Sequence, residues 1–266
     1  MKKVDTHAHV FEPGLKLASV RRYAPTYKAS IEDFVANFES KGLHAGVLIQ
    51  PSFLGTDNSY MVSAIEAFKD KMYGVAVIDP EAVTKEELQE LHEHNIIGIR
   101  LNLYGVELPD LTSESWQRVL SYVKELGWHV ELHFDASKLI PFIDMLLEAG
   151  VKIVVDHFGK PNVDGPLEDE GFKYLLEKAS TKQIWVKVSA CYRLGGLEKG
   201  FALAQEMMAP LLVAYGPDRL LWGSDWPHTQ FEQEITYDSM WEAFEKLVPV
   251  DVQESVLATS FEELLP

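Results

Sequence analysis

Val4-Asp5-Thr6-His7-Ala8-His9 is a short apolar run, typical of a buried strand, that ends in two histidines. Three later stretches repeat this pattern: Val130-Glu131-Leu132-His133, Val154-Val155-Asp156-His157 and Leu221-Trp222-Gly223-Ser224-Asp225. Each stretch finishes with a side chain that can bind a metal or move a proton. In a parallel α/β barrel all strand C-termini meet at one mouth, where the catalytic groups lie. The four stretches therefore predict an enzyme of the hydrolase class, whose site collects residues from distant parts of the chain.

The remaining sequence is consistent with this architecture. Eight runs have the Val/Ile/Leu-rich composition of strands that are covered on both faces. They lie at 3–10, 43–50, 72–79, 96–102, 128–133, 152–157, 184–190 and 219–225. Helical patterns separate them at 30–41, 84–95, 113–126, 139–149, 172–182 and 202–215. No low-complexity linker or sequence repeat interrupts the chain, so we expect residues 1–266 to form a single domain, with a helical tail at 236–265 closing the outer ring.

The charge balance excludes some classes of partner. Lys and Arg number 24 while Asp and Glu number 41, a net charge of −17, so the chain as a whole repels nucleic acid and anionic membranes. An anionic substrate would need a local basic patch. Cys191 is the only cysteine, which excludes an internal disulfide and favours a reducing compartment. No apolar stretch follows the first residues as a secretory signal requires, and no run approaches the ~18 apolar residues of a membrane span, so we expect a cytoplasmic protein.

Strand alternation predicts which side chains share a face, because side chains two residues apart point the same way. If His7 and His9 face the barrel interior, Asp5 does as well. The same rule gives four further pairs: Glu131 with His133, Val155 with His157, Arg100 with Asn102, and Lys187 with Ser189. An isolated charge in such an interior would cost several kcal/mol, by order of magnitude. We therefore expect Glu131 to pair with Lys187 or Arg100.

Asp225 is the candidate general base. It directly follows the last strand run and has aromatic neighbours, and burial among such groups raises the proton affinity of a carboxylate. The alternative is that Asp225 only caps a turn before Pro227. His7 and His9 can grip one ion or one carbonyl oxygen from the same strand face, or they form a polar strand end that faces solvent.

Cations and hydroxyls also follow the strands. The cations are Arg100, Lys160 and Arg193. They can hold a substrate carboxylate, or they form structural ion pairs with the protein's own carboxylates. Ser52 and Thr56 follow the second strand and can donate to a ligand oxygen, whereas Asp57 is expected to cap the next helix.

Other histidines and the cysteine have simpler interpretations. His133 and His157 either reach the mouth or are satisfied core histidines. Cys191 has no identifiable partner and is expected to be a small buried hydrophobe. We assign no role to the histidines on helices or at strand starts, which are His44, His92, His94 and His129.

Taken together, these motifs resemble the amidohydrolase superfamily, in the branch that contains 2-pyrone-4,6-dicarboxylate lactonase and sugar-lactone hydrolases. The ordered set of motifs runs from residue 5 to 228, which is most of the chain. The matching pieces are Asp5-Thr6-His7-Ala8-His9, Arg22-Tyr23-Ala24-Pro25, Gln50-Pro51-Ser52 through Asp57-Asn58, Gly98-Ile99-Arg100-Leu101-Asn102, Asp156-His157-Phe158-Gly159-Lys160-Pro161, Val186-Lys187-Val188-Ser189 with Tyr192-Arg193, and Trp222-Gly223-Ser224-Asp225-Trp226-Pro227-His228.

The resemblance implies a (β/α)8 TIM barrel and the hydrolysis of a lactone, often one that bears carboxylates. It implies that Asp225 takes a proton from water while His7, His9 and His157 polarise the lactone carbonyl. The substrate-binding candidates that it supplies are Tyr23, Ser52, Thr56, Arg100, Lys160, Ser189, Arg193 and His228.

The sequence also departs from the superfamily. Many members carry a lysine that bridges two metals, but no lysine ends the fourth or fifth strand here, which argues against a binuclear site. The usual Asn-Pro-Ala-Arg near the C-terminus is replaced by Thr259-Ser260-Phe261-Glu262-Glu263. His133 adds a possible ligand: His7, His9, His133 and Asp225 together would suit one zinc or manganese ion. The sequence leaves open whether turnover needs that ion or no cofactor.

Three alternatives stay open at this point. A metal-dependent non-oxidative decarboxylase of the same superfamily would carry a similar set of histidines and aspartate. A lactone isomerase would shift the ring without water. A protein that only binds carboxylates is the non-enzymatic alternative. The expected partner in each case is a small-molecule lactone or carboxylate, and the sequence identifies neither the lactone nor whether the chain forms a homo-oligomer.

Overall fold

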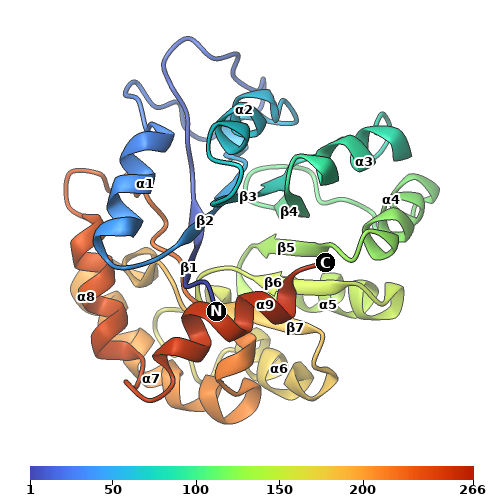
Figure 1. Cartoon of the computed structure of the whole chain (residues 1–266). Helices are drawn as coiled ribbons and strands as arrows, with labels where there is room; N and C mark the ends of the chain where they lie inside the picture. The colour runs from blue at the N-terminus through green and yellow to red at the C-terminus, as the bar shows by residue number, and fades with distance from the viewer.

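The computed structural model describes residues 1–266 and has eight parallel strands in one sheet, ordered β1 to β8 along the chain. Helices surround the sheet, so the chain forms the expected (β/α)8 barrel (Figure 1). The strands are β1 Val4–Ala8, β2 Ala45–Ile49, β3 Met72–Ala76, β4 Ile96–Asn102, β5 His129–His133, β6 Lys152–Val155, β7 Ile184–Lys187 and β8 Leu220–Leu221. The helices are α1 Ile31–Ser40, α2 Ser59–Ala67, α3 Lys85–Glu93, α4 Glu114–Glu125, α5 Ala136–Ala149, α6 Glu170–Lys178, α7 Leu197–Tyr215, α8 Tyr237–Leu247 and α9 Ser260–Leu264.

The barrel closes where β1 meets β8 and the segment after it. β8 is only two residues long, so the closure depends on single backbone hydrogen bonds rather than on a long ladder. Thr6 N donates to Trp222 O at 3.0 Å, and Asp225 N donates to His7 O at 2.8 Å. The second bond ties the backbone of the candidate base directly to that of the first histidine.

A register shift in β1 overturns one expectation from strand alternation. The pairing of β1 with β2 shifts between Asp5 and Ala8, so a β-bulge interrupts the alternation there. His7 faces the interior, where Lys187 Nζ lies 3.0 Å from its Nδ1. Asp5 instead accepts a hydrogen bond of 2.9 Å from the hydroxyl of Tyr237 on α8, outside the barrel. The prediction that Asp5 faces inward with His7 is wrong for this reason.

The end of β6 overturns a second expectation. Val154 packs in the barrel interior and Val155 packs in the outer core. The next residue that faces the interior is therefore Asp156, two positions after Val154. His157 does not share the face of Val155, because β6 has ended and His157 begins a turn with φ 51°. The pairs on β4 and β5 keep the predicted orientation, since Arg100, Asn102 and His133 line the same cavity while Glu131 bonds Lys187 below it.

Local signals in the sequence set several helix ends. Ser30 accepts a hydrogen bond from Asp33 N at the start of α1, and Gly150 ends α5 in the left-handed conformation. Asp57 lies one residue before the N-cap of α2 and accepts hydrogen bonds from Ser59. None of the helices combines the length and the apolar character that crossing a bilayer requires.

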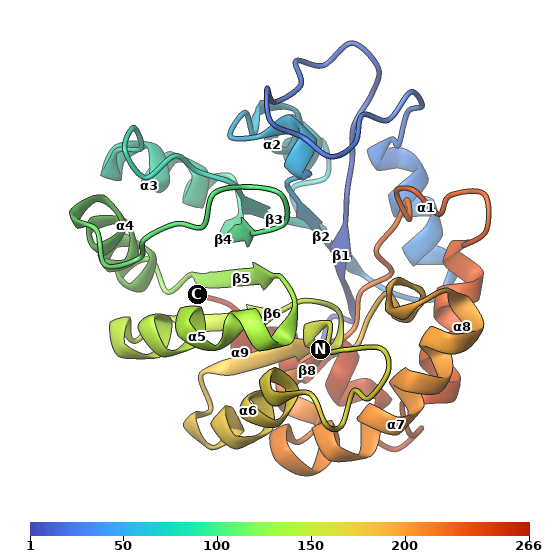
Figure 2. The ribbon, with the colours of Figure 1, turned by 180° about the vertical axis from the view of Figure 1, so that it is seen from behind.

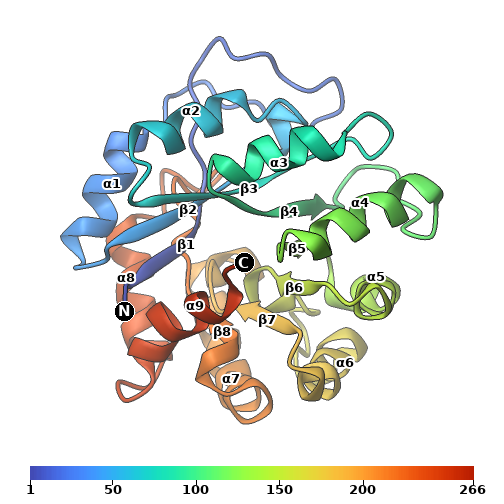
Figure 3. The ribbon, with the colours of Figure 1, turned by 45° about the vertical axis from the view of Figure 1, so that its right-hand side comes forward.

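The C-terminal tail is not one continuous helix. α8 ends at Leu247, a π-helical turn follows at Ser255–Thr259, and α9 completes the chain. α8 covers the outside as expected, but Phe261 and Leu264 of α9 pack into the same cluster as the interior residues of the strands. α9 therefore closes the N-terminal end of the barrel, and both chain ends lie there (Figure 3). The long segment between β1 and α1 extends beyond the barrel, as Figure 2 shows in blue.

Candidate active site

A cavity of about 240 Å³ opens at the C-terminal ends of the strands. Its wall holds one carboxylate, that of Asp225, and four cations: Arg22, Arg100, Lys160 and Arg193. The whole chain carries a net charge of −17, so this concentration of cations is the local basic patch that an anionic substrate requires.

Most of the residues predicted from the sequence reach this cavity. The wall contains Tyr23, Ser52, Arg100, Lys160, Arg193, His9, His133, His157 and Asp225. These residues come from the ends of different strands and from the loops after them, as the barrel architecture requires.

Thr56, His228 and Ser189 are the exceptions among the predicted substrate-binding residues, and Ser189 is described below with His157. Gly55 has φ 60° and turns the chain, so that Thr56 lines a separate groove beside α2 and α3. His228 is 2% exposed and its peptide N donates to Asp225 O at 2.8 Å. The structure therefore gives Thr56 no contact with the cavity and places His228 in the support of the Asp225 turn.

Asp225 lies at the floor of the cavity with its two oxygens in different surroundings. Oδ2 accepts hydrogen bonds of 2.5 Å from both the Tyr192 hydroxyl and Arg193 Nε. Oδ1 faces three imidazole nitrogens: it is 3.6 Å from His7 Nε2, 3.6 Å from His9 Nε2 and 3.9 Å from His157 Nε2. One carboxylate oxygen is thus held by the protein, while the other faces the reacting space.

The pKa of Asp225 is lowered, not raised as its aromatic neighbours in the sequence suggested. Burial alone would raise the pKa of this carboxyl, but Arg193, His157, His9 and His7 outweigh that effect and hold the pKa well below its usual range. Asp225 is therefore ionised at neutral pH. It is in the form that accepts a proton, although its ion pair with Arg193 weakens it as a base.

Three imidazoles of the site, those of His7, His133 and His157, are neutral, because burial is the largest influence on the pKa of each. It lowers the pKa of His157 to about 3 and the pKa values of His7 and His133 well below the usual value. His9 Nδ1 lies 2.7 Å from Ile49 O, which can only accept, so this nitrogen carries a proton, and in the neutral ring Nε2 has a free lone pair. The neutral ring of His9 can therefore accept a hydrogen bond at Nε2, 3.6 Å from Asp225 Oδ1.

Ser189 and His133 occupy less direct positions. Ser189 Oγ lies 2.9 Å from His157 Nδ1, behind the ring, so this serine orients His157 instead of lining the cavity. Both nitrogens of His133 lack a partner, and its ring lies 5.3 Å from that of His157. His133 thus faces the cavity as a neutral ring that a ligand can approach.

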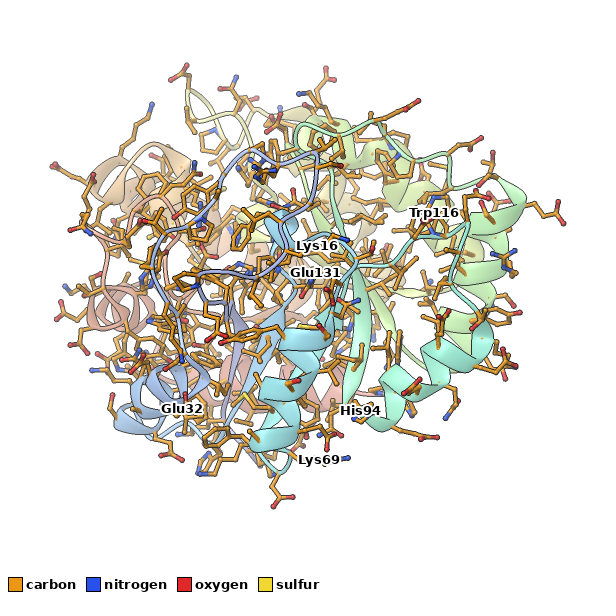
Figure 4. All side chains as sticks on the ribbon, turned by 90° about the horizontal axis from the view of Figure 1, so that it is seen from above. Lys16, Glu32, Lys69, His94, Trp116 and Glu131 are labelled. Carbon is orange, nitrogen blue, oxygen red and sulfur yellow. The ribbon has the colours of Figure 1, made fainter.

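A buried network of charges lies beneath the histidines. Lys187 Nζ is 2.5 Å from Glu131 Oε2, and Arg100 contacts Glu131 Oε1 at 3.3 Å, which confirms the expected pairing of Glu131. Arg100 also donates to Asp156 Oδ2 at 2.7 Å. Figure 4 places Glu131 well inside the molecule, and it is 0% exposed.

This network contains two carboxylates with opposite shifts. Burial, and then Asp156, raise the pKa of Glu131 to about 7, while Lys187 and Arg100 oppose the rise. For Asp156 the effect of burial is outweighed by Arg100, His7 and Lys187, which hold its pKa well below the usual value.

Sequence reasoning missed several residues that shape the site. Asp156 is one of them, and the inward position of Val154 two residues earlier is the signal that could have found it. Tyr104 is another: Lys160 Nζ lies 4.3 Å from its ring centroid and the Arg22 guanidinium lies 5.2 Å from it. Tyr104 thereby holds two cations of the cavity wall by cation–π contact, and no local motif marks it.

Two groups of potential metal ligands lie close together in the structure. They are His7, His157 and Asp225, and His7, Glu131 and Asp156; His133 belongs to neither. In the second group the ammonium of Lys187 already lies between the two carboxylates, 2.5 Å from Glu131 and 3.6 Å from Asp156. In the first group His7 Nδ1 faces the same ammonium, which can only donate, so the proton of a neutral His7 ring is on Nε2. A metal needs a lone pair at that nitrogen, so the residues as arranged do not fit a resident ion.

Comparisons with known proteins agree with this architecture. The model of the amidohydrolase family matches residues 4–260. The chain is 32% identical over 248 residues to 2-pyrone-4,6-dicarboxylate hydrolase of Comamonas testosteroni, covering 89% of this chain and 80% of that protein. It is also 32% identical over 234 residues to 4-sulfomuconolactone hydrolase of Rhizobium radiobacter, covering 85% of this chain and 76% of that protein.

A solved structure matches almost the whole chain. It is a probable 2-pyrone-4,6-dicarboxylic acid hydrolase from Acinetobacter baumannii with citric acid bound, 38% identical, with a TM-score of 0.95 and 99% coverage of each chain.

Proposed function

This chain belongs to the amidohydrolase family of hydrolytic enzymes, and we propose that it opens the ring of a small lactone that bears carboxylates. The observation that carries the proposal is the position of Asp225, whose Oδ1 faces three imidazole nitrogens within a cavity walled by four cations. The relatives named above as hydrolases of a pyrone dicarboxylate and of a sulfomuconolactone support an anionic lactone as the substrate.

The cations would bind the substrate's carboxylates. Charge-assisted hydrogen bonds from guanidinium to carboxylate are strong and directional, and they fix the ring in one orientation. Arg22 forms no ion pair with a carboxylate, and Arg193 pairs only with Asp225. Arg100, in contrast, is engaged with both Asp156 and Glu131. We therefore assign the main anchoring role to Arg22, Arg193 and Lys160.

The nucleophile would be a water molecule between Asp225 and His9. Asp225 Oδ1 and His9 Nε2 lie 3.6 Å apart, and both are acceptors, so one water can donate to each of them. Asp225 takes the proton from this water as it attacks the lactone carbonyl carbon. His9 orients the water through its remaining proton.

Nε2–H of His7 would stabilise the oxyanion that forms at the carbonyl, and His157 Nε2 lies beside it. Preorganised donors of this kind act where the negative charge develops, which is why they speed the reaction. When the tetrahedral intermediate collapses, the bond from the acyl carbon to the ring oxygen breaks. Protonated Asp225 returns the proton to that ring oxygen, so one water is added in total and Asp225 is regenerated.

A panel of lactones tests the proposal. Acid release should be measured for uncharged, monocarboxylate and dicarboxylate lactones, each with and without a chelator, in ¹⁸O-labelled water. We expect the carboxylated lactones to be hydrolysed, one ¹⁸O to enter the new carboxylate, and the chelator to have no effect. Ligand-induced changes in melting temperature without turnover would instead identify a binding protein. Isomerised product without label or release of CO₂ would contradict lactone hydrolysis.

A further inference from the structure

Lys187 lies beneath the catalytic histidines in a position that the reaction above does not use. Its side chain is 2% exposed, and its Nζ lies 2.5 Å from Glu131 Oε2 and 3.6 Å from Asp156 Oδ1. The same nitrogen is 3.0 Å from His7 Nδ1. A buried lysine thus contacts both carboxylates of the internal network and the first histidine of the site.

The chemistry of this contact determines where His7 carries its proton. A lysine ammonium has three donors and no acceptor, so His7 Nδ1 must accept. A neutral imidazole has one donor and one acceptor, so the other nitrogen, Nε2, carries the proton. Nε2 has no hydrogen-bond partner within the protein, and it faces Asp225 Oδ1 across 3.6 Å at the floor of the cavity.

We propose that Lys187 is a positioning residue that fixes His7 as the Nε2–H tautomer, so that His7 presents a proton donor to the bound carbonyl in place of a metal-binding lone pair. The benefit to catalysis depends on the proposed lactone hydrolysis. The tautomer itself does not, because it follows from contacts within the protein.

A competing contact makes the proposal specific. Asp156 Oδ1 lies 3.4 Å from His7 Nδ1 and has no hydrogen-bond partner. If Asp156 accepted from His7, the proton would move to Nδ1, and Nε2 would have the lone pair that metal-bound histidines use when a carboxylate orients them. Lys187 Nζ lies 3.0 Å from His7 Nδ1, which is 0.4 Å closer than Asp156 Oδ1 at 3.4 Å. The closer contact, that of Lys187, determines the tautomer. Removing Lys187 should let Asp156 take its place.

The test compares the wild type with a charge-matched double variant. Lys187→Met/Glu131→Gln removes the donor together with its carboxylate partner, so that no unpaired charge is buried. Glu131→Gln alone is the matched variant that keeps Lys187. Lys152→Met removes a lysine from the opposite end of the barrel, where it donates to Leu264 O and Leu265 O, and controls for the loss of a lysine as such.

Two measurements report on His7 without relying on activity. Two-bond ¹H–¹⁵N correlation spectra, assigned through the signals lost in His7→Asn, identify the tautomer. Zinc titration by calorimetry measures the affinity for a metal. We expect Nε2–H in the wild type, Glu131→Gln and Lys152→Met, and Nδ1–H in the double variant. Zinc affinity should rise about tenfold or more in the double variant, by analogy with changes of groups that orient metal-bound histidines.

An Nδ1–H tautomer in the wild type would overturn the proposal, and this result does not require any variant to fold. An Nε2–H tautomer that persists in a folded double variant would overturn it as well. Failure to hydrolyse any lactone would contradict the proposed function while leaving both of these readouts intact.

Discussion

Arg193 Nε lies 2.5 Å from Asp225 Oδ2, so the proposed base is ion-paired before any substrate enters. Arg193 also lines the cavity, where its guanidinium can receive a substrate carboxylate. A bound carboxylate would therefore compete with Asp225 for the same cation. As the competition weakens the ion pair, the pKa of Asp225 moves back toward its ordinary value, and the substrate's own charge makes the base stronger.

Arg193→Gln separates binding from activation. With the ion pair removed, Asp225 is a stronger base at all times, so kcat for an uncharged lactone should rise. The variant also loses an anchoring cation, so kcat/KM for a carboxylated lactone should fall about 10-fold or more, the effect of a charge-assisted hydrogen bond of ~1.5–3 kcal/mol. Steady-state kinetics on the two substrates measures both changes. Equal losses on the two lactones would contradict the competition described above.

Asp225→Asn removes the base while keeping the shape of the site. Asp225 has φ 60°, a conformation that asparagine also adopts readily, and the amide oxygen can still accept from Tyr192. We expect kcat to fall by about 10²–10⁴, the usual contribution of general base catalysis. Thermal melting should confirm that the variant is folded, and near-normal turnover by a folded variant would exclude Asp225 as the base.

Arg22 and Arg21 form a matched pair for testing the cationic wall. Both residues are exposed, but Arg22 lines the cavity, whereas Arg21 does not and donates to Ala18 O. Arg22→Gln should raise KM for a dicarboxylate lactone about 10-fold, by loss of one charge-assisted contact, and should hardly affect an uncharged lactone. Arg21→Gln should leave both values unchanged. If the two variants behave alike, Arg22 does not bind the substrate.

Lys160 should give the reaction an alkaline limit. Burial, and then Arg193, lower the pKa of its ammonium to about 8. The side chain is therefore cationic below about pH 8 and neutral above it, so kcat/KM for an anionic lactone should decline as the pH rises through this value. The profile is measured from pH 6 to 10 after subtraction of spontaneous hydrolysis. Lys160→Arg keeps its charge over this range and should abolish the decline.

Glu131 should matter for stability more than an exposed acidic residue does. Glu131→Gln leaves Lys187 without its closest carboxylate in a fully buried position, and breaking a buried pair costs about 3 kcal/mol or more. The free energy of unfolding, from urea titration, should fall by that amount. Glu125→Gln breaks the exposed pair with Lys85 and should have little effect, because solvent screens that pair. Similar small changes in both variants would mean that the network does not stabilise the fold.

The sequence predicted side-chain orientation where strands are regular, and it failed where they are not. Arg100 and Asn102 lie on β4, Glu131 and His133 lie on β5, and both pairs face as alternation requires. Asp5 was misplaced because a bulge in β1 cannot be recognised from residue types.

Loops and turns after the strands were harder to predict for a related reason. His157 has φ 51° and enters the site from a turn, and Thr56 leaves the site after the turn at Gly55. Such backbone conformations are set by tertiary contacts made elsewhere in the fold. The strand ends, which the sequence does mark, were therefore enough to locate the mouth of the barrel, while the loops decided which hydroxyls reach it.

The two chain ends have a practical consequence, because α9 closes the end of the barrel opposite the cavity and β1 starts there. A tether added before Met1 or after Pro266 would project from that face. The enzyme could thus be immobilised on a solid support, or fused to a second protein, through either end with its entrance still facing bulk solution.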